Sequence, residues 1–545
     1  MTNSARLTVS SRPSRPARGA ANARRIAAID IGSNSVRQIV ADVTPDGGIT
    51  VVDEMKAAPR LGADLDVTGV LGTTAMERAA EAVGRMATLA RQLGATRIEA
   101  VATSAVRDAA NGDQFVARVR QEADLELRII DGAGEARLSW LSALAHFDVG
   151  LGRTVVMDIG GGSLELVLAA DGVLDDLVSL PFGALRLTER YLRDGSGPKA
   201  LAKLRQHVRD ALKEVLPKRD WRGAQLIGSG GTFTNLASMH LARRGMLIAR
   251  NVHATVVPRM EVEHILDALA VMPASERGSV AGLNPERADI IVAGVAVAAE
   301  VMARLESREL HVSRYGIREG LLLELARVTP TVADPGEARE RSVREFAERC
   351  HYEAGHAMQV QRLALRLFDA FGARIGCTPD ERQTLSDAAL LHDVGYHINY
   401  DRHHKHSYHL ILHAELLGIT PAEQVVIANV ARYHRGAPPK RKHRNYAALD
   451  KELRDRIVRL SAILRVADGF DRGHIGAVGE LGVRFLQRAI RITPRPATNA
   501  TSLRLELWGA HRKSQLLAEL AGVPVEIVAE DGSVLSSEQV DELAG

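Results

Sequence analysis

The chain has 545 residues, of which 46% are hydrophobic and 25% are charged, and its formal net charge is +3. This length is too great for one hydrophobic core and indicates about three or four domains. The nearly balanced charge excludes a polycation built to bind nucleic acid over its whole surface, so any polyanion must meet local basic patches. The two cysteines, Cys350 and Cys377, are too few for a disulfide framework and fit a reducing cytoplasm.

Residues 1–24 are rich in Arg, Ser and Pro and contain no acidic residue, which predicts a disordered basic tail. A targeting arm, or an arm that tethers a polyanion, is the alternative. The longest apolar run, 290–299, falls short of the ~20 residues that span a bilayer. We therefore expect a buried helix there and no membrane span.

Strand-like and helical periodicities alternate from Arg25 to about residue 150 and predict an α/β lobe. Strands are expected within 25–43 and at 49–55, 98–103 and 127–130, and helices at 74–93 and 135–145. A second lobe begins with a strand at 154–157 and continues through a strand at 174–180.

Two nearly identical phrases follow apolar strands, Asp-Ile-Gly-Ser-Asn-Ser at 30–35 and Asp-Ile-Gly-Gly-Gly-Ser at 158–163. Glycine and small hydroxyl residues let the backbone turn tightly and direct N–H groups toward a phosphate. The repeat predicts a duplicated lobe with a phosphate-binding hairpin on each half and a cleft between them. The expected phosphate-binding residues are Gly32, Ser33, Asn34, Ser35, Gly160, Gly161, Gly162 and Ser163.

A third glycine-rich turn, 228–232, also follows an apolar strand and opens a helix whose N-terminus can face an anion. Gly230 and Gly231 are its expected phosphate-binding residues. A further helix follows 315–320, and the segment 329–337 is rich in Pro, Thr and Asp. We place a domain boundary there.

Beyond this boundary, residues 341 to about 470 have almost wholly helical periodicity, and 12 of the 19 histidines lie between His351 and His474. The final segment, from about residue 476, predicts a small α+β domain. Its strands are expected at 482–485, 489–492, 502–507 and 523–528, with a helix at 513–520. No chemistry is evident in it.

Five motifs in order carry a resemblance to a known family. They lie at 30–35, 102–109 (Ala-Thr-Ser-Ala-Val-Arg-Asp-Ala), 132–137 (Gly-Ala-Gly-Glu-Ala-Arg), 158–165 and 228–232. Residues 25 to about 325 thereby resemble the exopolyphosphatase/guanosine-pentaphosphate phosphatase family, within the superfamily of actin, sugar kinases and heat-shock ATPases. The resemblance implies an α/β fold with two ribonuclease H-like lobes, at 25–150 and 151–328.

The resemblance also implies catalytic roles. Glu135 corresponds to the family's catalytic acid, which would orient or deprotonate the attacking water. Asp158 and Glu165 would hold Mg²⁺, which prefers carboxylate and phosphate oxygens, and Arg107 would contact the transferred phosphoryl group. One departure is that Gly134 precedes Glu135, where the family often has a second acid.

The helical segment resembles the HD metal-dependent phosphohydrolases, which implies an all-α domain at 338–475. The small α+β domain expected from periodicity then covers 476–545. His356, His392, Asp393 and Asp468 occur in the order His, His-Asp, Asp of that superfamily. They would hold Mn²⁺, Fe²⁺, Zn²⁺ or Mg²⁺ in a mixed nitrogen and oxygen sphere, with His406 and His434 as ligands of a second ion. The alternative is a scaffold without metal that shapes a polyphosphate channel and a dimer interface.

The leading hypothesis is a cytoplasmic, Mg²⁺-dependent exopolyphosphatase that forms a homodimer and takes inorganic polyphosphate. Guanosine pentaphosphate or tetraphosphate is the alternative substrate, and the residues do not rank the two. An ATPase using the same turns, a bifunctional enzyme with a second site in the HD-like segment, and a regulator that binds without turnover remain open.

Overall fold

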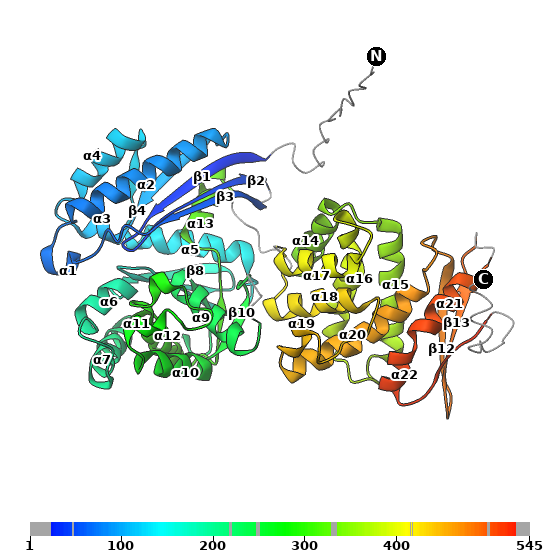
Figure 1. Ribbon diagram of the computed structural model, residues 1–545. Coiled ribbons are helices and arrows are strands. Elements are labelled where there is room, and N and C mark those ends of the chain that lie inside the picture. The colour runs from blue at the N-terminus through cyan, green and yellow to red at the C-terminus, as the bar shows by residue number, and fades with distance from the viewer. Residues whose placement is uncertain are drawn as a thin grey trace, which may run out of the picture. The chain divides into compact units, whose positions relative to one another are not determined.

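The computed structural model describes residues 23–45, 48–216, 221–246, 251–328, 335–414, 416, 418–498 and 502–529 (Figure 1). The tail expected at 1–24 lies almost wholly outside these ranges, as does most of the boundary segment expected at 329–337. The chain divides into two compact units, Met1–Ala224 with Tyr315–Val332 and Gln225–Arg314 with Ala333–Gly545. Each unit is described by itself.

A five-stranded sheet in the order β3-β2-β1-β4-β5 forms the first part of unit 1. β1 and β2 are antiparallel, as are β2 and β3, whereas β4 and β5 continue the sheet parallel to β1. The strands are β1 (Arg24–Ile31), β2 (Val36–Val43), β3 (Ile49–Ala57), β4 (Arg97–Ala102) and β5 (Leu127–Ile129). The apolar stretch 25–43 thus contains two strands joined by the first phosphate-type turn.

Helices cover both faces of this sheet. On β1, Ile29 and Ile31 pack in one buried cluster with residues of α2 (Thr73–Gln92) and α4 (Gly112–Ala123). Ile26 and Ala28 pack in another with α13 (Ile317–Ala326), which Figure 1 shows below the strands. Successive strand residues point to opposite faces, so this apolar strand buries both of them.

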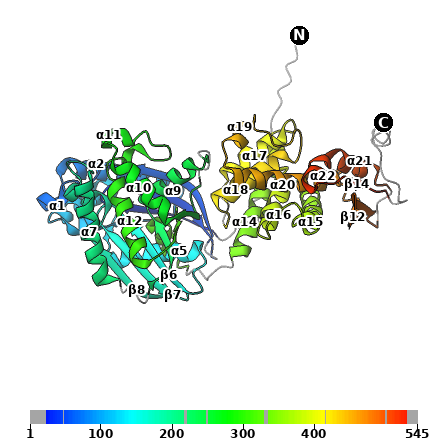
Figure 2. The same cartoon turned by 90° about the horizontal axis from the view of Figure 1, so that it is seen from below.

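The remainder of unit 1 contains an antiparallel set of three strands, which Figure 2 shows side by side. These strands are β6 (Arg153–Ile159), β7 (Leu164–Ala170) and β8 (Val173–Leu180). The helices are α1 (Leu65–Thr68), α3 (Ser104–Asp108), α5 (Gly132–His146), α6 (Ala184–Tyr191) and α7 (Pro198–Val215). The helix expected at 135–145 therefore begins three residues earlier, at a cap that Asp131 provides for Gly134 N.

Unit 2 begins with β9 (Gln225–Ser229), which is parallel to β11 (Glu309–Val312); β11 in turn is antiparallel to β10 (Thr255–Pro258). Its first helices are α9 (Gly231–Arg243), α10 (Arg259–Ala270), α11 (Ala274–Arg277) and α12 (Ile291–Leu305). The run 290–299 lies in α12 and is buried, which confirms the expected buried helix. Within the described ranges, a helix with the length and apolarity needed to cross a membrane is not found.

The histidine-rich part of unit 2 is helical, as its periodicity predicts (Figure 2). Its helices are α14 (Pro335–Arg349), α15 (Ala354–Phe371), α16 (Glu381–Leu391), the 3₁₀ turn η3 (Val394–His397), α17 (His403–His413), α18 (Pro421–Tyr433), α19 (Arg444–Ala447) and α20 (Lys451–Gly469).

The final segment has three strands in the order β12-β13-β14 and two helices. They are β12 (Val478–Phe485), β13 (Ile490–Pro496), α21 (Arg504–Lys513), α22 (Gln515–Ala521) and β14 (Val525–Ile527). The strand expected at 502–507 is wrong, because α21 begins within it. The alternating leucines suggested a strand, but Leu505 is 46% exposed, whereas Leu503, Leu507 and Ala510 are buried at helical spacing.

Candidate functional site

The two phosphate-type turns of unit 1 have the same backbone geometry. Gly32 N donates to Ser35 O at 3.1 Å, and Gly160 N donates to Ser163 O at 3.0 Å. The strands that flank them differ in charge: Asp30 pairs across the first hairpin with Arg37, whereas Asp158 pairs across the second with Glu165. The second hairpin therefore carries two facing carboxylates, which are the kind of ligand that a hard divalent cation takes.

The two turns lie against each other, and only residues without side chains fit between them. A Cβ on Gly161 would lie 3.0 Å from Asn34 N, and a Cβ on Gly162 would overlap Ser104 Oγ and lie 2.7 Å from Ser33 Oγ. Ser33 and Ser104 hydroxyls are themselves hydrogen-bonded at 3.0 Å. The structure thus brings together the turn residues that the repeat predicts.

Helix α5 presents Glu135 and Ser139 on one face, one turn apart. Glu135 is 3% exposed, and Arg107 Nη1 donates to its Oε1 at 2.6 Å and to Ile130 O at 2.9 Å. Ser139 Oγ donates to Asp158 Oδ2 at 2.8 Å. One helix therefore fixes the expected water-activating acid and orients an expected ion ligand.

Burial dominates the electrostatics of these carboxylates. It raises the pKa of Glu135 to about 7, although Arg107 favours the ionised form. Burial also raises the pKa of Glu165 well above its usual range, and the charges of Glu135 and Asp158 raise it further. Such crowded buried carboxylates require a positive partner to be ionised together.

Mg²⁺ fits the donors at the second hairpin. Asp158 and Glu165 are buried, directly opposed in register, and offer the oxygen atoms that Mg²⁺ prefers. Ser179 Oγ donates to Glu165 Oε1 at 3.1 Å and orients it. Mg²⁺ is commonly held by one or two carboxylates with substrate phosphates as further ligands, so two protein ligands suffice here.

The third turn lies in unit 2 and is described there alone. Gly230 has φ +96°, a conformation that favours glycine, and Gly231 begins α9. A Cβ on Gly231 would overlap the guanidinium of Arg287. The turn thus has the expected strand–turn–helix form, with a guanidinium beside its helix N-terminus.

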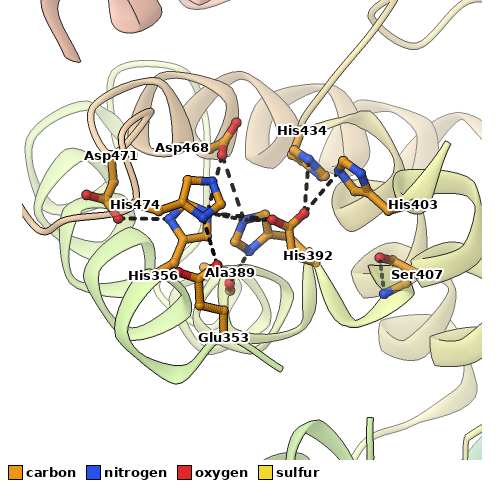
Figure 3. Close-up of polar contacts among 12 residues, drawn as sticks. Glu353, His356, Ala389, His392, His403, Ser407, His434, Asp468, Asp471 and His474 are labelled. Carbon is orange, nitrogen blue, oxygen red and sulfur yellow. Dashed lines mark hydrogen bonds and ion pairs between the residues drawn. The ribbon is translucent and has the colours of Figure 1, made fainter. Parts of the chain in front are cut away.

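A second cluster, the His/Asp cluster, lies in the helical part of unit 2 (Figure 3). Its members are His356, His392, Asp393, His403, His434 and Asp468. Nδ1 of His392 donates to Ala389 O at 2.7 Å, and Nδ1 of His434 donates to Ala431 O at 2.6 Å. Because a carbonyl only accepts, each ring keeps its Nε2 lone pair for the cluster.

The other two imidazoles are fixed in the same way. Nδ1 of His403 lies 3.0 Å from Tyr400 O, and Nδ1 of His356 lies 2.8 Å from Oδ2 of the buried Asp471. The rings of His356 and His474 are stacked, with centroids 3.6 Å apart. All four Nε2 atoms therefore turn toward the carboxylates, as metal ligands do.

Asp393 faces both halves of the His/Asp cluster. Its Oδ2 lies 3.6 Å from His356 Nε2 and 3.5 Å from His392 Nε2, and its Oδ1 lies 3.2 Å from His403 Nε2 and 3.4 Å from His434 Nε2. Asp393 with His356, His392 and Asp468 would hold one divalent ion, and Asp393 with His403 and His434 would hold another. We call these residue sets the first and the second ion position.

The carboxylates and imidazoles of the cluster differ in their protonation. Burial opposes ionisation of Asp393, yet the surrounding imidazoles lower its pKa well below the usual range. Burial lowers the pKa of His434 to about 3, so this ring is neutral. His434 and Asp393 are thus in the states that bind a divalent ion. Burial opposes protonation of His356, but Asp468 and Asp471 raise its pKa to about 9, so this ring must release a proton before its Nε2 can bind an ion.

The structure differs from the sequence hypothesis at the second ion position, where His403 rather than His406 joins Asp393 and His434. His403 is 1% exposed at the start of α17, whereas His406 is only half-buried. Asp471, His474 and Lys513 also contact the cluster and had no role in the sequence hypothesis. Asp471 lies three residues beyond Asp468, which was the one available signal.

Comparison with known protein families identifies the family of this chain. Residues 39–328 match the Ppx/GppA phosphatase family, and residues 338–493 match domain III of Ppx/GppA phosphatases. The chain belongs to the Ppx/GppA phosphatase family. The expected α/β fold with a helical domain and a small β-containing segment is confirmed for this Ppx/GppA chain.

Two curated relatives carry different names. Exopolyphosphatase 1 of Mycobacterium leprae is 32% identical over 59% of this Ppx/GppA chain and 94% of its own length. The guanosine-5'-triphosphate,3'-diphosphate pyrophosphatase of Pseudoalteromonas atlantica is 26% identical over 81% of this chain and 86% of its own. A crystal structure of an exopolyphosphatase from Cytophaga hutchinsonii is 26% identical, with a TM-score of 0.53, over 57% of this chain and 100% of that one. The family is made up of hydrolases that generally depend on divalent metal ions.

Proposed function

We propose that this Ppx/GppA protein is an exopolyphosphatase that releases terminal orthophosphate from inorganic polyphosphate with Mg²⁺. The observation that carries the proposal is Glu135, a buried carboxyl group with a pKa of about 7, held by Arg107 beside the paired turns. A carboxylate of this kind accepts a proton from water near neutral pH.

The proposed reaction is an in-line displacement between the two turns. Backbone N–H groups of the glycine turns bind the terminal phosphoryl oxygens, and Arg107 neutralises part of their charge. Glu135 takes a proton from the attacking water as the water oxygen bonds to phosphorus. The bond from phosphorus to the bridging oxygen breaks, and the shortened polyphosphate leaves as an anion that carries this oxygen. Mg²⁺ held by Asp158 and Glu165 would supply additional positive charge on the phosphoryl oxygens.

Guanosine pentaphosphate remains the alternative substrate. The relative from Mycobacterium leprae is named for exopolyphosphatase activity, and the one from Pseudoalteromonas atlantica for action on guanosine-5'-triphosphate,3'-diphosphate. Both reactions cleave a terminal phosphoanhydride and need the same groups. We favour polyphosphate because the named exopolyphosphatase has the higher identity and is covered over 94% of its length. The proposal includes a homodimer, which rests on the family resemblance, and a cytoplasmic location, which the two cysteines fit.

The test compares phosphate release by the wild type and Glu135→Gln, with long-chain polyphosphate and Mg²⁺. We expect the variant to lose about 10²- to 10⁴-fold of the rate, as removal of a general base does. Glu324→Gln is the matched control, because Glu324 is 41% exposed and pairs with Arg128. Equal rates for Glu135→Gln and the wild type would refute the role of Glu135. Turnover of guanosine pentaphosphate but not of polyphosphate would refute polyphosphate as the substrate.

The His/Asp cluster supports a second candidate function, a metal-dependent phosphohydrolase site. The supporting observation is that all four Nδ1 atoms are engaged by carbonyls or a carboxylate, so that four Nε2 atoms converge on Asp393 and Asp468. Two divalent ions so held would bind a phosphoryl group and activate water.

This second function is tested by Mn²⁺ binding and by nucleotide hydrolysis in His392→Ala. We expect the ion affinity of the cluster and any hydrolysis that depends on it to be lost, while Glu135-dependent phosphate release from polyphosphate persists. If His392→Ala binds Mn²⁺ like the wild type, the cluster is a scaffold without metal.

A further inference from the structure

Lys513 connects the C-terminal segment to the His/Asp cluster. It is the last residue of α21, and its ammonium forms an ion pair with Oδ2 of Asp468. The lysine side chain is 17% exposed and the aspartate side chain 12% exposed. The segment that showed no chemistry in the sequence thus places a cation at the cluster.

The packing of α21 on α20 holds Lys513 in this position. The helices cross at two glycines, Gly469 and Gly509, so closely that a Cβ on Gly469 would lie 2.7 Å from Gly509 O. The buried Glu506 of α21 also accepts from Gly473 N at 3.2 Å. Lys513 lies one turn after the crossing and Asp468 one residue before it, so direct backbone packing brings the two charges together.

The two oxygens of Asp468 have different neighbours. Oδ1 lies 3.7 Å from His356 Nε2 and 3.8 Å from His392 Nε2, at the first ion position. Oδ2 pairs with Lys513. An ammonium group has three N–H donors, so Lys513 can remain on Oδ2 and donate to a second acceptor while Oδ1 binds an ion.

We infer that Lys513 binds the phosphoryl group of the substrate at the His/Asp cluster, so that the C-terminal segment forms part of that site. The inference rests on the second candidate function. A phosphoryl group bound at the first ion position would lie beside Asp468, and its oxygens would meet the remaining N–H groups of Lys513. The substrate class is therefore an anionic phosphate compound.

A purely positioning role predicts a different result. If Lys513 only oriented Asp468, its loss would weaken ion binding, as the loss of other groups behind metal ligands does. If it binds phosphate, its loss weakens phosphate binding and leaves ion binding intact or stronger, because a positive charge beside the ion is removed. The two affinities change together in the first case and separately in the second.

The experiment titrates the full-length protein with Mn²⁺ and then the Mn²⁺-loaded protein with inorganic phosphate, using calorimetry. For Lys513→Met we expect phosphate affinity to fall about 10- to 100-fold, the effect of losing a charged hydrogen bond, with Mn²⁺ affinity no weaker than in the wild type. Lys513→Arg should retain most of the phosphate affinity. Arg512→Met is the matched control, because this neighbouring cation is exposed and lies over Trp508.

His392→Ala separates this inference from the function on which it rests. Phosphate binding that persists in that variant belongs elsewhere in the protein and is subtracted. If His392→Ala and the wild type bind Mn²⁺ equally, the ion site is refuted and the role of Lys513 with it. If Mn²⁺ binding depends on His392 but Lys513→Met leaves phosphate affinity unchanged, or weakens Mn²⁺ affinity as well, only the inference about Lys513 is overturned.

Discussion

The carboxylate site of unit 1 and the His/Asp cluster of unit 2 are suited to ions in different ways. At the first, Asp158 and Glu165 face each other from paired strands, and Arg107 holds the buried acid Glu135. At the second, four imidazoles are fixed through Nδ1 around two carboxylates before any substrate arrives. Under the proposed function, the carboxylate site would need a phosphate substrate to complete the ligands of an ion, whereas the cluster would supply nearly all of the ligands itself.

The largest expected effect is a loss of ion affinity at the His/Asp cluster. Asp393→Asn should weaken both ion positions by more than the roughly 10- to 100-fold that loss of a group behind a ligand costs, because Asp393 faces both with separate oxygens. Mn²⁺ titration of the metal-stripped protein measures this. His403→Ala should weaken the second position alone, and equal effects of the two variants would contradict a bridging role.

A smaller effect is expected when a supporting group is changed. Asp471 accepts from His356 Nδ1 at 2.8 Å and is fully buried, so Asp471→Asn should lower Mn²⁺ affinity at the first ion position about 10- to 100-fold. His403 and His434 have other partners, and the second ion position should be unchanged. A uniform loss at both positions would indicate general unfolding.

The carboxylate site of unit 1 can be tested through the close packing of its two turns. Gly162→Ala should reduce phosphate release by about tenfold or more and destabilise the fold by about 1–3 kcal/mol, because its Cβ would meet Ser33 and Ser104. Gly160→Ala is the control, since the nearest atom to its Cβ would lie at 3.6 Å. Rate assays and thermal unfolding of both variants measure the difference, and equal behaviour would contradict close packing of the turns.

The smallest effect concerns pH. Burial raises the pKa of Glu135 to about 7, and Arg107 keeps it from rising further by favouring the ionised form. Arg107→Met should therefore keep Glu135 protonated to higher pH and move the acidic limb of the phosphate-release profile upward by about one pH unit or more. The profile of kcat/KM against pH measures this shift, and a limb that stays or moves to lower pH would show that Glu135 is not the base.

Local patterns predicted most of the fold. The Asp-Ile-Gly turns, the strand–turn–helix at 228–232 and the helical periodicity after 341 each depend on residues close in sequence, and the structure contains all three. The prediction of a strand at 502–507 failed because leucines alternate there, which is the pattern of a half-buried strand. The buried partners of α21, on α20, decide the outcome, and no local pattern reveals them.

Site residues could be predicted from the sequence where they belong to a recognisable motif. His392 and Asp393 are adjacent and form a recognisable His-Asp motif. The run 403–406 contains three histidines, and only the structure shows that His403 is the one that lies beside Asp393 and His434. Asp471 and Lys513 act on their partners across loops or between separate helices. Lys513 therefore has no signature in spacing, and Asp471 has only its position three residues beyond Asp468.

The register of the two hairpins has an evolutionary consequence. If the lobes arose by duplication, the ancestral hairpin had one residue at the position now occupied by Arg37 and Glu165, opposite the shared aspartate. The charge at this one position is now opposite in the two hairpins: Arg37 favours the ionised form of Asp30 against the effect of burial, whereas Glu165 adds a second carboxylate beside Asp158, where the proposed function places Mg²⁺. Divergence at a single cross-strand site would thus make an ion-binding half and an ion-independent half from the same turn.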